Sequence, residues 1–268
     1  MGLSHLISIV GAGPGDPELL TIKALNRLKD ADVILYDALT GNEILELANP
    51  GSKKIYVGKL YKDGQNQVER QNEIHAKFLK YSVQNKRVVR LKAGDPMIFG
   101  RGAEEVRFCK ENNLNYEVIP GVTAGIAASA LFDIPLTERG KSSSVLFCAG
   151  SRENGCFSNI DSMVQILKSG SPAVIYMGLN ILADLAGALI NKTVESSMSV
   201  QILCNISRPN QKIYSTTLGN ILVVLQQNSI ETPATIIIGK FAPQITKDAI
   251  ENFSDRNTLA KWEFIKVE

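Results

Sequence analysis

The chain has 268 residues, of which 44% are hydrophobic, and this is enough for one large or two ordinary domains with buried cores. A formal net charge of only +2 provides no overall basic field and argues against a nucleic-acid partner. The four cysteines and two histidines lack metal-site spacing, and no segment is apolar for long enough to cross a membrane. We therefore expect a cytoplasmic protein with reduced thiols, no structural metal and no membrane partner.

Short apolar strands alternate with helical stretches through the first half of the chain, which predicts a parallel sheet covered by helices. The expected strands are 6–10, 33–36, 55–57, 88–91 and 116–119. One helix is expected to follow the first strand and to end at Leu28, and two more are expected at 67–84 and 103–112. The second and third of these strands leave a polar residue at their carboxyl ends, Asp37 and Lys59.

A glycine-rich loop at 11–17 follows the first strand, and we expect Asp16 to cap the next helix with Pro17 at its first position. Together with Asp37 some twenty residues on, this loop suggests a nicotinamide oxidoreductase. However, Asp16 stands where the third glycine of GxGxxG would fall, and Pro14 occupies the turn. The dinucleotide interpretation is therefore weakened.

A second glycine loop lies in residues 88–105, VVRLKAGDPMIFGRGAEE. The segment 93–96 must end the strand, because glycine permits unusual φ angles while proline fixes its own and lacks a donor. Arg101 and Glu104 are three residues apart at a helix start, so they project toward one face. Ligands of open α/β sheets bind at this edge, although a plain turn with an exposed ion pair is the structural alternative.

The second half also alternates, with a boundary expected near 122–137. The expected domains are 1–122 and 123–245, followed by an appendage at 246–268. A short turn joins two consecutive strands here, which predicts mixed parallel and antiparallel pairing. Strands are expected at 144–149, 173–176, 200–203, 213–216 and 235–238, with helices at 123–131, 160–167, 181–190 and 218–226.

Several segments, in matching order over roughly residues 5–240, resemble the tetrapyrrole methylase family. They include GAGPGDPELLTIKAL, VVRLKAGDPMIFGRGAEE, VIPGVTAGIAASA, IPLTER, VIYMGL and TPATIIIG. FGRGAEE and IPLTER are more specific than either glycine loop and favour the branch that acts on uroporphyrinogen III.

This resemblance implies two α/β/α domains with the active site in the cleft between them, and a homodimer. It also implies S-adenosylmethionine as methyl donor and S-adenosylhomocysteine as product. The reaction would be C-methylation of uroporphyrinogen III at C2 and C7, giving precorrin-2 via precorrin-1 for sirohaem, cobalamin or haem d1 synthesis. Alternatives are a later precorrin methyltransferase, a diphthine synthase, an RNA ribose methylase, or a donor-binding protein without catalysis.

The resemblance also assigns roles to residues by position. The donor would be lined by Pro14, Ala93, Gly94, Asp95, Ile98, Thr123, Ala124, Met177 and Ile206. Proton movement would involve Asp37 and Lys59, and the substrate and its reaction would involve Arg101, Glu104 and Arg139. Guanidinium groups suit a macrocycle with eight carboxylates, because they bind carboxylates bidentately.

Glu104 or Asp37 would accept the proton that the macrocycle sheds, and Glu104 is slightly favoured because Arg101 is beside it. Plain structural roles compete with these assignments. Asp37 could cap a strand end, Lys59 could be solvated, and Met177 could fill the core. Lys92 and Arg208 are weaker cationic candidates and could be ordinary surface charges.

The chain departs from the family pattern at a few positions. These departures bear on the identity of the methyl acceptor more than on the identity of the methyl donor. Ala93 replaces the first glycine of the usual GGDP, and Leu60 replaces an arginine. A short insertion follows at 61–67, and Glu138 and Ser151 each stand where a histidine is usual. These departures keep the non-catalytic alternative open.

Overall fold

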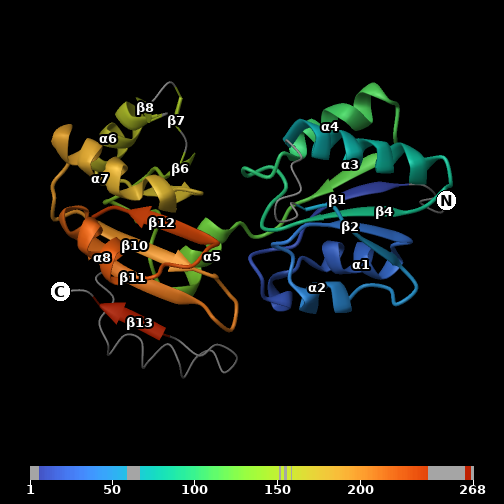
Figure 1. Cartoon of the computed structure of the whole chain (residues 1–268), viewed down its shortest axis with the longest axis horizontal. Coiled ribbons are helices and arrows are strands. Elements are labelled where there is room, and N and C mark those ends of the chain that lie inside the picture. The colour runs from blue at the N-terminus through green and yellow to red at the C-terminus, as the bar shows by residue number, and fades with distance from the viewer. Residues whose placement is uncertain are drawn as a thin grey trace. The chain divides into compact units, whose positions relative to one another are not determined.

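A computed structural model describes residues 6–58, 67–150, 152–153, 156–157, 159–240 and 263–266. The chain divides into two compact units, Met1–Thr123 and Ala124–Glu268, which are considered separately below (Figure 1). Lys59, Leu60, most of the insertion at 61–67, and Ser151 lie outside the described residues.

The first unit is built on a five-stranded parallel sheet with the order β3-β2-β4-β1-β5. The central strands β1, β2 and β4 are almost entirely buried because helices cover both faces of the sheet. The predicted parallel sheet is therefore confirmed. Its strands are β1 (Ile7–Gly11), β2 (Val33–Tyr36), β3 (Lys53–Tyr56), β4 (Val88–Lys92) and β5 (Tyr116–Ile119).

Helices cover the two faces of this sheet in pairs (Figure 1). Helices α1 (Ile22–Asp30) and α2 (Asn42–Glu46) pack on one face, while α3 (Gln67–Ser82) and α4 (Gly102–Glu111) pack on the other. The neighbouring strands β1 and β4 thus lead to helices on opposite faces. Such a switch point opens a crevice at the carboxyl ends of the two strands, where ligands of open α/β sheets bind.

The expected start of the first long helix is wrong. Asp16 caps only a short 3₁₀ turn at Pro17–Leu19, and its carboxylate accepts from the Glu18 backbone amide at 2.8 Å. The chain is extended at the next two residues, and Thr21 then caps α1 by accepting from Ala24 N at 3.1 Å. The segment therefore contains two helix starts in succession.

The second unit contains a six-stranded sheet with the order β13-β11-β10-β12-β9-β6. Pairs β6–β9 and β11–β13 are parallel, and the other neighbouring pairs are antiparallel, which confirms the predicted mixture. β13 belongs to the segment predicted as an appendage. The strands are β6 (Leu146–Ala149), β9 (Ala173–Tyr176), β10 (Ser199–Cys204), β11 (Lys212–Thr217), β12 (Ala234–Ile238) and β13 (Glu263–Lys266).

One face of the second sheet packs on α6 (Ile160–Lys168), α7 (Leu182–Asn191) and α8 (Ile221–Gln227). Helix α5 (Ala124–Leu131) covers the other face, where the Gly125 amide donates to the Tyr176 hydroxyl at 3.0 Å. Short 3₁₀ turns, Leu179–Ile181 and Leu218–Asn220, precede α7 and α8. The sequence did not predict α2 or the hairpin of β7 (Arg152–Glu153) and β8 (Cys156–Phe157). Among the described helices, none is long and apolar enough to cross a membrane.

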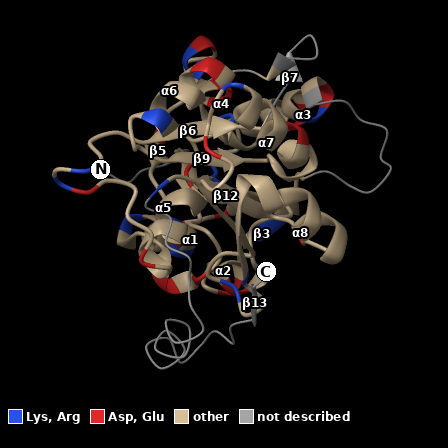
Figure 2. Ribbon diagram, turned by 90° about the vertical axis from the view of Figure 1, so that its left-hand side faces the viewer, with Lys and Arg blue, Asp and Glu red and all other residues tan. Residues whose placement is uncertain are grey.

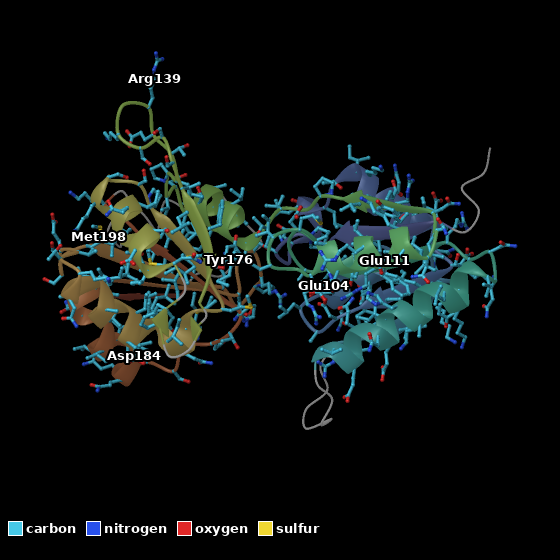
Figure 3. The ribbon with its side chains drawn as sticks, turned by 90° about the horizontal axis from the view of Figure 1, so that it is seen from above. Glu104, Glu111, Arg139, Tyr176, Asp184 and Met198 are labelled. Carbon is cyan, nitrogen blue, oxygen red and sulfur yellow. The ribbon has the colours of Figure 1, made fainter. Side chains whose placement is uncertain are left out.

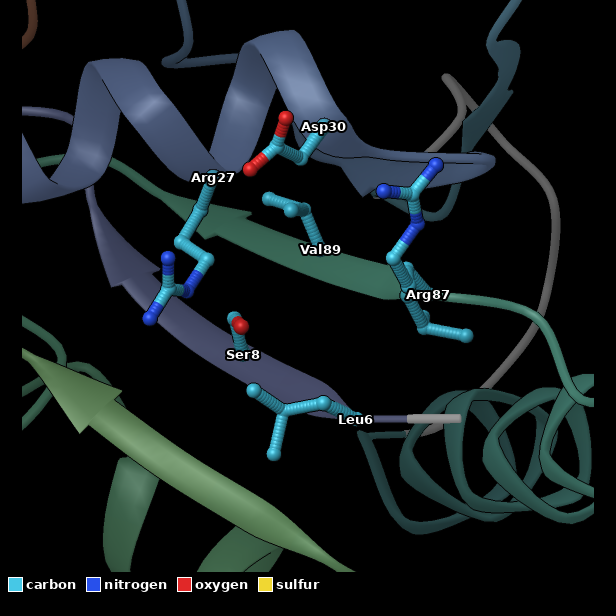
Figure 4. Close-up of a pocket in the computed structure, with 7 residues that line it drawn as sticks. Leu6, Ser8, Arg27, Asp30, Arg87 and Val89 are labelled. Carbon is cyan, nitrogen blue, oxygen red and sulfur yellow. The ribbon is translucent and has the colours of Figure 1, made fainter. Parts of the chain in front are cut away.

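A charge cluster stabilises the first unit at the amino ends of its strands. Glu117 on β5 accepts from Ser8 Oγ at 2.9 Å and forms ion pairs with Arg27 and Lys23 of α1. Nearby, a cavity of about 140 Å³ is lined by Ser8, Arg27 and Arg87, among others (Figure 4). This cavity lies at the edge of the sheet opposite the crevice between β1 and β4.

Glu117→Gln is expected to lower the free energy of unfolding at neutral pH by roughly 2 kcal/mol, discounted for partial exposure. Burial alone would raise the pKa of Glu117, but hydrogen bonds from Arg27, Lys23 and Ser8 outweigh it and lower the pKa to about 2. This stabilisation is present above the unfolded value near 4.5 and is lost as pH falls toward 2. Urea unfolding in a pH series should therefore show the two proteins converging in acid. A constant difference would contradict the assignment.

Candidate functional site

The loops after β1 and β4 are joined by backbone hydrogen bonds at the switch point. Gly13 N donates to Gly94 O at 3.2 Å, and Gly94 N donates back to Gly13 O at 2.7 Å. Ala12 N donates to Lys92 O at 2.7 Å. The two glycine loops predicted from the sequence as ligand-binding are thus one connected structure.

These loops also pack against the loop after β5 with no room for side chains. A Cβ atom added at Gly11 would lie 2.5 Å from Gly121 N, and one added at Gly121 would lie 2.3 Å from Gly94 O. Real Cβ atoms essentially never approach so closely. Gly94 has φ +66°, a conformation that favours glycine. The three loops therefore meet backbone to backbone, and this close packing fixes their shape at the carboxyl edge of the sheet.

Asp95 braces two of these loops. Its Oδ1 accepts from Met97 N at 2.8 Å, and its Oδ2 accepts from Gly121 N at 3.0 Å. The carboxylate therefore fixes the shape of the predicted donor site through the protein backbone. Thr123 is buried beside Gly94, while Ile98 is partly exposed and Pro14 lies in the loop after β1.

Arg101 and Glu104 form a bidentate ion pair, which confirms that they share one face. Arg101 Nε donates to one carboxylate oxygen at 2.9 Å and Nη2 donates to the other at 2.6 Å. Both side chains remain more than one third exposed, so a substrate can reach them. The hydrogen bond from Arg101 lowers the pKa of Glu104, which makes that carboxylate a weaker base.

A buried charge network lies beneath this pair. Arg90 and Lys92 alternate along β4 on the face that α4 covers, and both contact Glu105, whose side chain is fully buried. Arg90 also pairs with Asp37 at 3.4 Å, at the carboxyl end of β2. Lys92 is only 4% exposed, so its interpretation as an ordinary surface charge is wrong.

Asp37 is accessible and held in place from several directions. Its side chain is 27% exposed. Its Oδ1 accepts from Leu39 N at 3.3 Å and Thr40 Oγ1 at 3.5 Å, while Oδ2 faces Arg90. The Asx turn agrees with the plain role of a strand-end cap. The contact with buried Arg90 goes beyond that role.

Four other predicted site residues belong to the second unit. Ala124 begins α5, and Ile206 is buried in the loop after β10. Met177 follows β9 and is 65% exposed, so the alternative that it fills the core is wrong. Arg139 lies at the tip of an exposed loop and points away from the body of its unit (Figure 3). It forms no ion pair with any described residue.

Left-handed backbone conformations occur in several predicted site loops, as well as at turns elsewhere in the described chain. Phe99 and Arg101 have φ +53° and +59°, Met177 has φ +55°, and Asn205 and Ser207 on either side of Ile206 have φ +52° and +60°. Non-glycine residues adopt this region uncommonly, and such strain concentrates at functional sites.

Sequence reasoning assigned no role to Arg90 or Glu105. A signal was available, because Arg90 interrupts an apolar strand with hydrophobic residues on both sides. A charge at such a position must be paired when it is buried. Elsewhere, acidic and basic residues are interspersed along the helices and loops of each unit (Figure 2).

Residues 6–222 match the family model described as Tetrapyrrole (Corrin/Porphyrin) Methylases. A siroheme synthase of Psychrobacter arcticus is 40% identical over 87% of this chain and 42% of the relative. One of Hydrogenovibrio crunogenus is 40% identical over 87% of this chain and 48% of the relative. The chain thus spans about half the length of the curated relatives it matches.

Solved structures are similar over most of the chain. A uroporphyrin-III C-methyl transferase from Thermus thermophilus, complexed with S-adenyl homocysteine, has a TM-score of 0.73 and 34% identity. The match covers 88% of this chain and 97% of that one. A cobalt precorrin-4 methyltransferase has a TM-score of 0.78 at 24% identity, covering 89% and 96% of the two chains, and shows the fold alone. By its match to the family model and its identity to these relatives, the chain belongs to the tetrapyrrole methylases.

Proposed function

We propose that this chain transfers methyl groups from S-adenosylmethionine to C2 and C7 of uroporphyrinogen III, giving precorrin-2 via precorrin-1. The observation that carries the proposal is the pair of glycine loops joined at the switch point, with Arg101 and Glu104 at the start of the helix that follows. The 34% identity to a uroporphyrin-III C-methyl transferase complexed with S-adenyl homocysteine also supports the proposal. The product would serve sirohaem, cobalamin or haem d1 synthesis.

The predicted donor site is built on loops of fixed shape. Gly11 and Gly121 pack backbone to backbone, and Gly94 has a positive φ. S-adenosylmethionine supplies an activated methyl on a sulfonium. The residues Pro14, Ala93, Gly94, Asp95, Ile98, Thr123, Ala124, Met177 and Ile206 would hold it. Holding reactants in line can supply about 7 to 11 kcal/mol of the barrier.

The acceptor would be held and deprotonated by side chains at the same sheet edge. The Arg101 guanidinium can bind a substrate carboxylate in two-point fashion, with Glu104 orienting it. Asp37 is the better proton acceptor of the two carboxylates, because Glu104 is engaged by Arg101 and has a lowered pKa. Lys59 and Arg139 complete the set expected from the family, and both roles remain predictions.

Donor binding is the first test. Titration calorimetry with S-adenosylhomocysteine should give saturable binding, whereas NAD should give none. Tight NAD binding without a response to S-adenosylhomocysteine would reject the proposal. Incubation with S-adenosylmethionine and enzymatically made uroporphyrinogen III should then produce the spectrum of methylated products. Donor binding without methylation would support the alternative of a non-catalytic binder.

Ala93→Gly is expected to change donor affinity less than tenfold. Ala93 is not in the left-handed region, unlike its neighbour Gly94, so its methyl group imposes no backbone strain. Calorimetry on the variant measures the effect, and Gly94→Ala provides the contrast because φ at that position is +66°. A large gain for Ala93→Gly would mean that the natural alanine impairs the site.

We also propose that the protein is a cytoplasmic homodimer, as expected from the family resemblance. The near-neutral charge and the absence of a membrane-spanning helix among the described residues are compatible with this proposal. Analytical ultracentrifugation would give the mass in solution. A monomer at micromolar concentration would remove the homodimer from the proposal.

A further inference from the structure

We infer that Glu105, the second glutamate of the GRGAEE segment, is a positioning residue that orients Asp37 through Arg90. This inference rests on the proposed function, since Asp37 is the proton acceptor assigned there. It extends the site from the carboxyl edge of the sheet into the layer between β4 and α4. Glu105 itself is too deeply buried to touch a substrate.

The carboxylate of Glu105 contacts both cations of β4, Arg90 and Lys92. Its Oε1 accepts from Arg90 Nε at 3.1 Å and from Lys92 Nζ at 2.9 Å. Its Oε2 is buried and has no hydrogen-bond partner among the described residues. A buried carboxylate with one unsatisfied oxygen is costly, and apolar residues of similar volume often stabilise such a site better. Stability alone therefore gives a weak reason for this arrangement.

Arg90 links Glu105 to Asp37 with a fixed guanidinium. Nε points at Glu105, Nη1 donates to the carbonyls of Leu91 at 2.9 Å and Leu35 at 3.4 Å, and Nη2 reaches Asp37 Oδ2 at 3.4 Å. All three nitrogens thus have acceptors, and the plane of the group is determined by the fold. A planar guanidinium can donate hydrogen bonds to these acceptors at the same time, whereas the ammonium group of a lysine cannot.

Lys92 balances the remaining charge. Burial lowers the pKa of Lys92, and nearby Arg90 lowers it further, while Glu105 opposes both effects. With Lys92 and Arg90 charged, Glu105 and Asp37 supply the matching negative charges. Removing the Glu105 charge would leave two cations facing Asp37 alone. Asp37 would then hold a proton less readily and would be a weaker base.

Other charged or titratable groups also act on this network. Arg101, which precedes α4, and Cys109 of α4 interact electrostatically with Glu105, and His75 does so from α3. The groups to be considered in any pH profile are therefore Asp37, His75, Arg90, Lys92, Arg101, Glu105 and Cys109. Of these, only Arg90 forms an ion pair with both carboxylates in the described part of the chain.

The test compares Glu105→Gln with Glu117→Gln, which removes the same charge from a cation-paired carboxylate at the opposite edge of the sheet. For Glu105→Gln we expect kcat to fall about thirtyfold, less than the fall of about a hundredfold or more expected for loss of the general base itself, with the KM for the donor nearly unchanged. The acid limb of its pH profile should move to lower pH. Glu117→Gln should keep the wild-type profile even though it is less stable. Equal profiles for all three proteins would overturn the inference.

Carbon-13 NMR of the Asp37 carboxyl group tests the same network without any turnover. Its titration midpoint should move to lower pH in Glu105→Gln and to higher pH in Arg90→Met, because these variants remove opposite charges. Shifts of the same sign, or none, would reject the role of Arg90 as the link. If wild-type protein fails to methylate uroporphyrinogen III while the opposite shifts are seen, the proposed function fails and the link stands. Arg90→Met alone supplies the test if Glu105→Gln does not fold.

Discussion

Asp37→Asn should slow methyl transfer by about a hundredfold or more, the usual range for loss of a general base. Asparagine keeps the shape of the side chain and can still accept from Leu39 N, so the turn after β2 should persist. The amide cannot take a proton from the macrocycle at neutral pH. Single-turnover measurement of methylated product isolates this step from product release, and calorimetry should show unchanged donor affinity.

Two further variants decide what this result means. Glu104→Gln should have a smaller effect, because Glu104 is bound bidentately by Arg101 and its pKa is lowered. Asp32→Asn removes a carboxylate paired with Arg87 at the other end of β2 and should leave the rate unchanged. If Glu104→Gln were the more damaging of the two site variants, Glu104 would be the base and Asp37 a structural cap.

Arg101→Ala should lower kcat/KM for uroporphyrinogen III by on the order of thirtyfold or more. Loss of one partner of a charge-paired contact typically costs about 2 to 5 kcal/mol of binding free energy. Donor affinity should stay nearly constant, because the family resemblance assigns Arg101 to the substrate and not to the donor. Arg107→Ala on the exposed side of α4 is the matched control. Arg139→Ala is expected to act in the same direction as Arg101→Ala. Parallel loss of donor binding and activity would contradict the substrate role.

The backbone of Arg101 makes a second variant informative. With φ +59°, Arg101 occupies a conformation that costs a non-glycine residue about 1 kcal/mol or more. Arg101→Gly should therefore unfold at a temperature equal to or above that of the wild type, although it loses an exposed ion pair. Its activity should fall as in Arg101→Ala. A variant that loses activity without losing stability shows that the arginine is retained for its chemistry.

The sheet of the first unit could be predicted because its strands are short apolar runs between loops of glycine and polar residues. The first helix was misplaced because Asp16 and Thr21 are both good caps, and the sequence does not show which one begins an α-helix. Helix α2 has only five residues, so its periodicity is too short to detect. The boundaries of helices are set by tertiary packing, which the local sequence pattern does not contain.

The pair Arg101–Glu104 was predictable from spacing alone, since residues three apart on a helix meet. The contacts of Glu105 with Arg90 and Lys92 join segments 13 and 15 residues apart, and they depend on how α4 lies over β4. Spacing does not encode that packing. The left-handed conformations of Phe99 and Met177 were equally hidden, because neither residue type favours positive φ.

The contact among Gly11, Gly94 and Gly121 has a consequence for engineering. Gly11 and Gly121 have no room for a side chain, and Gly94 has a positive φ that disfavours one, so a mutagenesis library gains little at these positions. The exposed segment 97–99 beside them carries no such restriction. Directed evolution toward a new acceptor can therefore randomise the exposed side chains of Met97 and Phe99, while Ile98 is kept because it is a predicted donor-site residue.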